Sequence, residues 1–114
     1  MIPLTVWVAL LLQPCTIVGT SGPDYLVGRA ANDVICGLGG ADVITGGGGR
    51  NVIRAGAGDD RIVAKEGADT VFAGPGADII WSWDANADRI DGGPGRDRAY
   101  TNSFDTVKNV ESRS

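Results

Sequence analysis

One pattern of apolar and polar positions recurs every nine residues along most of this chain. Each period holds one main apolar residue, an acid or amide two residues before it, and in most units glycines before the acid. The apolar positions are Leu26, Ile35, Ile44, Ile53, Ile62, Val71, Ile80, Ile90, Ala99 and Val107. The acid positions are Asp24, Asp33, Asp42, Asn51, Asp60, Asp69, Asp78, Asp88, Asp97 and Asp105. Because one repeat cannot bury its single apolar residue alone, the pattern predicts a solenoid of stacked repeats.

Each repeat divides into six turn-like residues and a three-residue strand. The units cover residues 19–27, 28–36, 37–45, 46–54, 55–63, 64–72 and 73–81, then a ten-residue unit 82–91 and a further unit 92–100. Side chains alternate along a strand, so the apolar middle residue should face inward and its neighbours outward. Glycines in the turns permit positive φ and let successive turns approach closely. The sequence therefore predicts an all-β fold without a conventional globular core.

The stretches GLGGADVIT, GGGGRNVIR, AGAGDDRIV and GGPGRDRAY resemble the nonapeptide G-G-x-G-x-D-x-U-x, in which U is a large apolar residue. About nine such units in tandem, roughly residues 19–100, resemble the RTX, or haemolysin-type, calcium-binding repeat family. The resemblance implies a right-handed parallel β-roll with two nonapeptides per coil, here a solenoid of about five coils. It also implies calcium ions held between turns of successive coils by aspartates and carbonyl oxygens of the glycine loops.

Alternate repeats fall on the same edge of such a roll, eighteen residues apart. The first edge carries Asp24, Asp42, Asp60, Asp78 and Asp97, with glycine two residues before each: Gly22, Gly40, Gly58, Gly76 and Gly95. The second edge carries Asp33, Asn51, Asp69, Asp88 and Asp105. On the second edge glycine is irregular at that position, Asn51 has no charge, and Lys65–Glu66 intrudes on one turn. We expect ligands on both edges and stronger metal binding at the first.

Calcium suits this arrangement for electrostatic reasons. Carboxylates stacked at the strand spacing of about 4.8 Å would repel by about 3 kcal/mol per adjacent pair at an effective dielectric near 20. Calcium takes six to eight oxygen ligands in flexible geometry, whereas magnesium needs a smaller octahedron and zinc prefers nitrogen or sulfur. The alternative is a ladder of Asx-turns, in which each aspartate caps its own turn without metal.

The composition limits the other functions. A chain of 114 residues has room for one domain, and a net charge of −4 with scattered basic residues argues against nucleic acid. Without histidine, imidazole-based catalysis and zincin motifs are excluded, and no G-x-S-x-G elbow occurs. The acids are nearly all aspartate, with Glu66 and Glu111 as the two glutamates. We therefore expect a non-enzymatic protein and nominate no catalytic residue.

The chain divides into an apolar start, residues 1–14, the roll, residues 15–107, and a polar tail, residues 108–114. The apolar start is too short to span a bilayer and resembles the h-region of a secretory signal. The alternative is an apolar strand that caps the first repeat. The signal interpretation predicts a secreted, extracellular protein, and Phe104 with the polar tail is expected to cap the open end of the roll.

Cys15 and Cys36 are the only cysteines, and an even number in a secreted protein suggests a disulfide. The repeat register argues against the bond, because it stacks Cys15 on Asp33 and Cys36 on Val18, a lateral offset of roughly 10 Å. A disulfide needs Cα atoms within about 7 Å. The bond requires the first strand to leave the ideal register, and the sequence leaves both states open.

The ten-residue unit contains Asp84, Asn86 and Asp88, and its D-x-N-x-D start resembles an EF-hand loop. Arg89 occupies the glycine position of that loop and Gly95 the position of its bidentate glutamate, so an EF-hand is not expected. An extra irregular calcium site and a simple bulge are the remaining alternatives.

One outward patch is conspicuous. Val63, Trp81 and Tyr100 align at one strand position, and Ile79 lies beside Trp81. Such an alignment is typical of cross-strand packing, and the alternative is a contact surface for a sugar, a protein or a second copy. The sequence thus predicts an exported calcium-binding β-roll. Its alternative is a cell-surface or carbohydrate-binding adhesion module that uses this aromatic face.

Overall fold

The computed structural model describes residues 14–82, 86–102 and 105–113, and these residues form twelve short strands and no helix. The strands are β1 (Ile17–Val18), β2 (Tyr25–Val27), β3 (Val34–Cys36), β4 (Val43–Thr45), β5 (Val52–Arg54), β6 (Arg61–Val63), β7 (Thr70–Phe72), β8 (Ile79–Trp81), β9 (Arg89–Asp91), β10 (Arg98–Tyr100), β11 (Thr106–Lys108) and β12 (Ser112–Arg113). The described part of the chain accordingly offers no helix suited to crossing a membrane.

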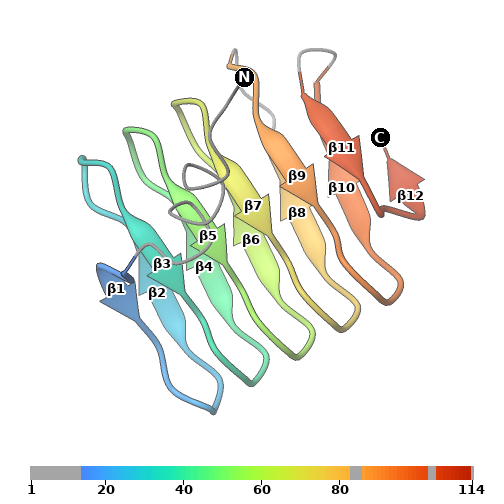
Figure 1. The fold of residues 1–114 in the computed structure, drawn as a ribbon, viewed down its shortest axis with the longest axis horizontal. Helices are drawn as coiled ribbons and strands as arrows, with labels where there is room; N and C mark the ends of the chain where they lie inside the picture. Colours follow the sequence, from blue (N-terminus) through green and yellow to red (C-terminus); the bar gives the residue numbers. More distant parts are fainter. Residues whose placement is uncertain (1–13, 83–85, 103–104, 114) are drawn as a thin grey trace, which may run out of the picture.

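The strands form two parallel sheets of six strands each, one behind the other in Figure 1. The odd sheet has the order β1-β3-β5-β7-β9-β11, and the even sheet has the order β12-β10-β8-β6-β4-β2. The chain passes from one sheet to the other between every two consecutive strands, so two repeats complete one coil. Matching residues of neighbouring coils pair side by side, as Ile35 with Ile53 and Ile44 with Ile62. The predicted all-β parallel β-roll of about five turns is confirmed.

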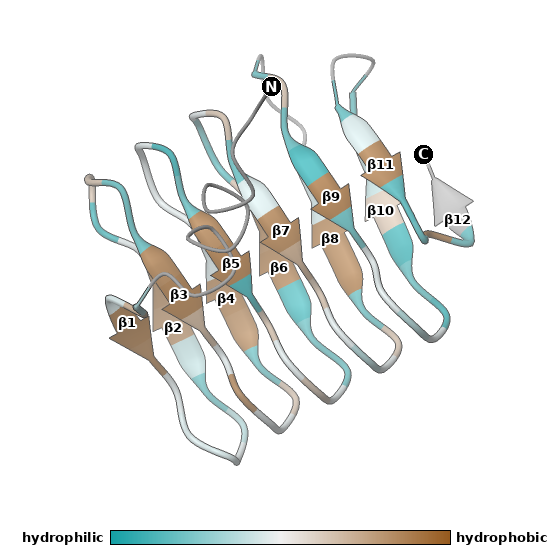
Figure 2. Ribbon diagram, in the orientation of Figure 1, coloured by the Kyte–Doolittle hydropathy of each residue, from teal (hydrophilic) through white to brown (hydrophobic). Residues whose placement is uncertain are grey.

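A row of apolar residues from each sheet fills the space between the sheets. The middle residue of each interior strand is buried, and Figure 2 shows the apolar positions on the strands with mostly hydrophilic or intermediate positions in the turns. The large buried side chains of this core are Ile35, Ile44, Ile53, Ile62, Val71, Ile80 and Ile90. Since one coil supplies only two such residues, each coil depends on its neighbours for a core.

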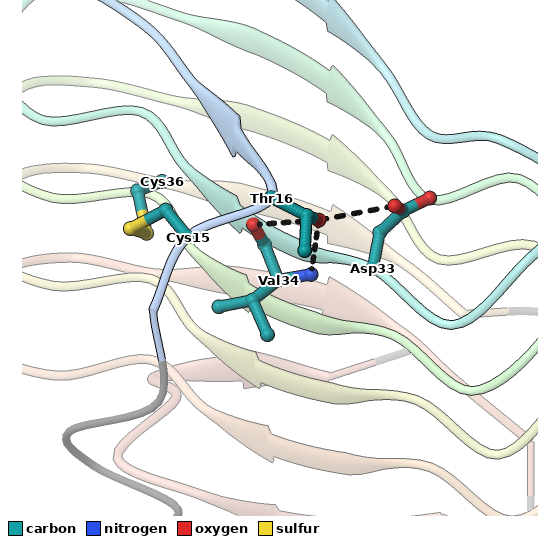
Figure 3. The surroundings of a disulfide bond; sticks show 5 residues. All are labelled: Cys15, Thr16, Asp33, Val34 and Cys36. Carbon is teal, nitrogen blue, oxygen red and sulfur yellow. Dashed lines mark hydrogen bonds between the residues drawn. A yellow bond between two sulfur atoms is a disulfide. The ribbon is translucent and has the colours of Figure 1, made fainter.

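The first coil leaves the repeat register at Thr16. Strand β1 pairs as predicted, with Val18 opposite Cys36, but the chain bends at Thr16. Cys15 therefore does not stack on Asp33 and instead forms a disulfide with Cys36, with the two Cα atoms 5.9 Å apart (Figure 3). The bond exists because the chain departs from the ideal register, which is the condition that the repeat geometry sets. Of the signal-like start, residues 1–14, residues 1–13 lie outside the described residues.

The extra residue of the ten-residue unit lies in the turn between β8 and β9. The pairing continues beyond it, since Thr70 pairs with Arg89 and Ile80 with Ala99. Asp84 lies outside the described residues, so the extra calcium site stays untested there, whereas Asp88 joins the second edge.

At the carboxyl end, β12 pairs with β10 after a connection of only three residues, 109–111. Ordered pairing therefore extends into residues 108–114, for which the sequence predicted only a polar tail. Phe104, the expected cap residue, lies outside the described residues.

The aromatic patch lies on the outer face of the even sheet. Val63, Trp81 and Tyr100 follow one another in register, and Ile79 occupies the neighbouring position on β8. The rings of Trp81 and Tyr100 stack with their centroids 5.8 Å apart and their planes at 8°. All four side chains are half-buried. The two rings thus pack against each other across the strands, a contact that stabilises a sheet.

Candidate metal centre

The acid positions stand directly before the strands, at the end of each turn, so the strand register places them in two rows. The first edge precedes the strands of the even sheet, and the second edge precedes those of the odd sheet. The buried members are Asp33, Asp42, Asn51, Asp60, Asp69, Asp78, Asp88, Asp97 and Asp105, whereas Asp24 is half-buried. Aspartate is almost never fully buried unless it is paired. The partners of these carboxylates therefore decide what the rows can do.

One oxygen of each buried ladder residue after Asp33 ties its coil to the coil before it. Oδ1 of Asp60 accepts a hydrogen bond from the backbone N–H of Asp42 at 2.9 Å, and Oδ1 of Asp78 accepts one from the N–H of Asp60 at 2.8 Å. The same bond joins the pairs Asp24–Asp42, Asp78–Asp97, Asp33–Asn51, Asn51–Asp69, Asp69–Asp88 and Asp88–Asp105. These bonds differ from the Asx-turn alternative, in which an aspartate caps only its own turn.

The other oxygen of the interior first-edge aspartates accepts no hydrogen bond from the residues that the structure describes. It is the buried Oδ2 atom of Asp42, Asp60, Asp78 and Asp97. On the second edge, Oδ2 of Asp69 and Asp88 also accepts no hydrogen bond, although both residues make further contacts. A buried polar atom left unsatisfied costs about 1–3 kcal/mol, and a charged one costs more. A repeated row of such atoms fits a ligand other than a protein donor.

At the amino end of the ladder, protein groups satisfy the second oxygen. The backbone N–H of Thr20 donates to Oδ2 of Asp24 at 2.7 Å. The backbone N–H of Arg29 donates to Oδ2 of Asp33 at 2.7 Å, and the Arg29 guanidinium forms an ion pair with Oδ1 of Asp33 at 2.7 Å. We call a turn closed where its own backbone N–H reaches Oδ2, and open where Oδ2 has no donor.

On the first edge, the backbone of the second and fourth turn residues differs between open and closed turns, whereas on the second edge the open turn of Asp69 has positive φ at its fourth residue, Gly67 (106°), and not at Lys65. In the four open turns of the first edge both residues have positive φ: Leu38 (69°) and Gly40 (85°), Gly56 (84°) and Gly58 (105°), Gly74 (81°) and Gly76 (119°), and Gly93 (73°) and Gly95 (111°). In the closed turns of Asp24 and Asp33 neither residue has positive φ, and the N–H of the second residue is the donor. The left-handed second residue therefore does not deliver its N–H to the carboxylate.

Main-chain carbonyl oxygens of the next coil lie close to the unpaired carboxylate oxygens. A Cβ added to Gly37 would stand 2.6 Å from Oδ2 of Asp42 and 2.5 Å from the carbonyl oxygen of Ala55. A Cβ added to Gly92 would likewise meet Oδ2 of Asp97 and the carbonyl oxygen of Asn109. A carboxylate oxygen and a main-chain carbonyl oxygen thus adjoin the same small space at both turns, as they do at Gly19 in the closed turn of Asp24, where the N–H of Thr20 satisfies the carboxylate.

Side chains alone do not complete a metal site here. Across residues 14–82, 86–102 and 105–113, no three acidic, histidine or cysteine side chains come together. A cation on the first edge would be held by carboxylates of neighbouring coils together with turn carbonyl oxygens. Calcium accepts such a set, since backbone carbonyls and aspartates are among its ordinary ligands.

Asn51 shows which group lies opposite the side-chain atom that does not make the ladder bond. Its Oδ1 accepts the ladder bond from the N–H of Asp33 at 3.0 Å, and its Nδ2 donates to the carbonyl oxygen of Gly48 at 3.2 Å. Its turn has the open backbone, with φ of 75° at Gly47 and 80° at Gly49. An amide nitrogen satisfies a turn carbonyl here. The first-edge aspartates present an oxygen where Asn51 presents this nitrogen, and a cation between two oxygens would remove their repulsion.

The charge environment differs between open and closed turns. Burial, followed by the neighbouring carboxylate of Asp42, raises the pKa of Asp60 from 3.8 to about 7. Burial and neighbouring ladder carboxylates also raise the pKa values of Asp42, Asp78 and Asp97. Burial acts in the same direction on Asp33, but hydrogen bonds from Arg29 and Thr16 outweigh it and lower its pKa. Asp33 thus has a cationic partner in Arg29, whereas among the described residues no ion pair forms at Asp42, Asp60, Asp78 or Asp97.

The predicted ligands therefore fall into distinct groups. The structure aligns Asp42, Asp60, Asp78 and Asp97 as open acids, with Gly40, Gly58, Gly76 and Gly95 in the left-handed conformation beside them. Asp24 with Gly22, and Asp33, belong to closed turns. Asn51, Asp69 and Asp88 continue the second edge. Stronger binding at the first edge stays a prediction.

Two residues of the ladder escaped the sequence pattern. Glu111 accepts a hydrogen bond from the N–H of Asp97 at 2.7 Å, the place that an aspartate fills in earlier coils. Ser82 is buried and donates its hydroxyl to Oδ2 of Asp105 at 2.7 Å. The nine-residue period does not predict either one. The only signal for Glu111 is that it is one of two glutamates.

A family comparison agrees with this geometry. The model of the RTX calcium-binding nonapeptide repeat matches four times, over residues 16–44, 37–71, 54–86 and 84–103. No curated protein matched the chain. The four matches overlap, span most of the chain and include the ladder from Asp24 to Asp97. The chain therefore belongs to the RTX calcium-binding nonapeptide repeat family.

Proposed function

We propose that this protein is a structural, non-catalytic calcium binder whose first edge holds calcium ions between successive coils. The observation that carries the proposal is the row of buried Oδ2 atoms without hydrogen bonds at Asp42, Asp60, Asp78 and Asp97. Each open carboxylate would supply this oxygen, and carbonyl oxygens of the adjacent turns would supply further ligands. When bound, calcium supplies positive charge between groups that otherwise repel.

Calcium is favoured over other cations by the donor set. The open turns offer oxygen alone, from carboxylates and main-chain carbonyls, and the repeated turns lack the histidine and thiolate ligands that zinc prefers. Magnesium demands a near-ideal octahedron and keeps several waters, whereas calcium accepts a larger and less regular set of oxygens. Family membership points to the same ion.

We propose in addition that the protein acts outside the cell. The Cys15–Cys36 disulfide supports this, since such bonds persist in oxidising compartments. Extracellular calcium modules bind with Kd values of about 10⁻⁴–10⁻³ M, so export would move the chain from calcium-poor to calcium-rich surroundings and there complete its fold.

Calorimetric titration with calcium tests the proposal, with Asp42→Asn and Asp33→Asn as a matched pair. Both changes remove one buried ladder carboxylate, but Asp42 lies in an open turn and Asp33 in a closed one. We expect Asp42→Asn to bind fewer calcium ions than the unchanged chain, and Asp33→Asn to bind the same number. A wild-type chain that binds no calcium at millimolar concentration would refute the function. Equal ion counts in the two variants would refute the assignment to the first edge.

A further inference from the structure

The carboxyl end of the first edge contains an acid that the repeat does not predict. Ser112 pairs with Arg98, so Glu111 stands in register with Asp97, where the next coil would have its aspartate. The connection before it is shorter than the six-residue turns of earlier coils, and Glu111 comes fourteen residues after Asp97 instead of eighteen. The longer glutamate side chain reaches the position all the same, since its Oε2 accepts the N–H of Asp97 at 2.7 Å.

An unsatisfied oxygen lies beside Glu111. Oδ2 of Asp97 is buried without a hydrogen bond, and Asp97 as a whole is only 2% exposed. The carbonyl oxygen of Asn109 and this Oδ2 both lie against Gly92, as the corresponding pair lies against Gly37 in an interior open turn. The end of the first edge therefore repeats the arrangement of the interior coils, with Asn109 and Glu111 in place of the missing turn.

Two surface hollows adjoin Glu111. One, of about 300 Å³, is lined by Arg96, Asp97, Arg98 and Glu111. The other, of about 490 Å³, is lined by Asp91, Gly93, Pro94, Gly95, Asn109 and Glu111. The positively charged residues near Glu111 do not neutralise its carboxylate. Lys108 pairs with Asp91, and among the described residues neither Arg96 nor Arg98 forms an ion pair with Glu111.

We propose that Glu111 is a calcium ligand and completes a last site on the first edge with Asp97 and the carbonyl oxygen of Asn109. The inference rests on the proposed calcium function and extends it to a residue outside the nonapeptide repeats. Calcium at this site would join the connection 109–111 and β12 to the last full coil. The C-terminal cap of the roll is then ordered by calcium, as the interior coils are.

Glu111→Gln tests the proposal, because glutamine keeps an oxygen that can accept the N–H of Asp97 but loses the charge. Glu66→Gln is the matched control, since Glu66 is the other glutamate, lies exposed in a turn and also loses one charge. Native mass spectrometry and calorimetry with calcium alone should show one ion fewer for Glu111→Gln, or one site weakened by at least about tenfold, as expected from ligand charge. Glu66→Gln should match the unchanged chain.

Hydrogen exchange distinguishes a ligand from a simple cap. In calcium, residues 106–113 should be protected in the unchanged chain and in Glu66→Gln, and should lose protection in Glu111→Gln while the interior strands keep theirs. If Glu111→Gln binds the same number of ions with unchanged affinity and protection, Glu111 is only a hydrogen-bond acceptor and the inference is wrong. If the unchanged chain binds no calcium, the proposed function itself fails, which is a separate result.

Discussion

Aspartate and asparagine differ by one atom in this ladder, and that atom decides whether a turn needs a cation. The amide of Asn51 donates to the carbonyl oxygen of Gly48, whereas Oδ2 of Asp60 has no donor within the described part of the chain. Both side chains are buried to the same extent and use Oδ1 for the same ladder bond. The sequence predicts the positions of both residues from the period alone. It could not predict which oxygens stay unpaired, because that depends on the φ values of the turn.

Asp60→Asn should therefore have opposite effects without and with calcium. In calcium-free buffer near pH 8 the amide removes a buried charge and can donate to a turn carbonyl as Asn51 does, so the melting temperature should rise. Relief of an unsatisfied buried group is worth about 1–3 kcal/mol. In calcium the variant should lose an ion and melt below the unchanged chain. Thermal melts in both buffers check this, and a melting temperature that moves in the same direction in both would contradict it.

Asn51→Asp makes the reverse change on the second edge. The turn already has the open backbone, so a carboxylate there should add a cation ligand and raise the number or affinity of bound calcium ions. The exposed Arg50 beside it opposes this, and Asp33 is already satisfied by Arg29. In chelator the same change should destabilise the protein, because it replaces a donor with an acceptor at Gly48. Calcium titration of both forms decides it, and no gain in affinity would show that this turn is not a metal turn.

The turn is the element that makes an aspartate open or closed. Glycine at its second and fourth residues accepts positive φ without steric cost. Leu38 is the exception, since it takes φ of 69° in the open turn of Asp42 and is 48% exposed. A left-handed conformation costs a non-glycine residue roughly 1–2 kcal/mol. Glycine before the acid is the signal for this turn in the sequence, and Leu38 shows that a residue other than glycine can take the same backbone conformation.

Leu38→Gly should stabilise the protein by removing this strain. The gain should be about 0.5–1 kcal/mol after the entropy cost of glycine, which corresponds to a melting temperature a few degrees higher. Leu38→Ala is the control, because it removes the exposed side chain but keeps the strained φ, and it should give no gain. Denaturant unfolding in calcium measures both, and equal stabilities for the two variants would contradict the strain.

At the scale of the whole molecule, the period predicted the two sheets, their parallel pairing and the inward apolar rows. All three features follow from the same nine-residue repeat, so a sequence with a regular period is enough to predict them. The two ends could not be predicted in this way. The chain bends at Thr16 to form the disulfide of Cys15, and it shortens a turn so that Glu111 reaches Asp97. Each end departs from the repeat through residues that the period does not include, so the period alone does not predict them.

The raised pKa values predict how pH affects the calcium-free roll. A folded-state pKa of about 7 for Asp60, against an ordinary value of 3.8, means that the folded form holds more protons than the unfolded form between these two pH values. Stability should therefore fall as pH rises from about 4 to about 7, and the raised pKa values of Asp42, Asp78 and Asp97 act in the same direction. The lowered pKa values of Asp33 and Asp91 act only below 3.8.

In calcium-depleted buffer, the melting temperature should be higher at pH 5 than at pH 8. In saturating calcium the order should reverse, because acid competes with the ion for the carboxylates. Melting curves at both pH values measure this. A calcium-free protein that gains stability on going from pH 5 to pH 8 would show that ionisation of the open aspartates does not destabilise the fold.

The central claim is that calcium completes this fold, and far-UV circular dichroism tests it most directly. The protein is measured at neutral pH in chelator and again after titration with calcium to millimolar concentration, with magnesium as the control ion. We predict that the β signal is lost or strongly reduced in chelator and that calcium, but not magnesium, restores it together with a higher melting temperature. A spectrum and melting temperature that are the same in chelator and in calcium would contradict the account.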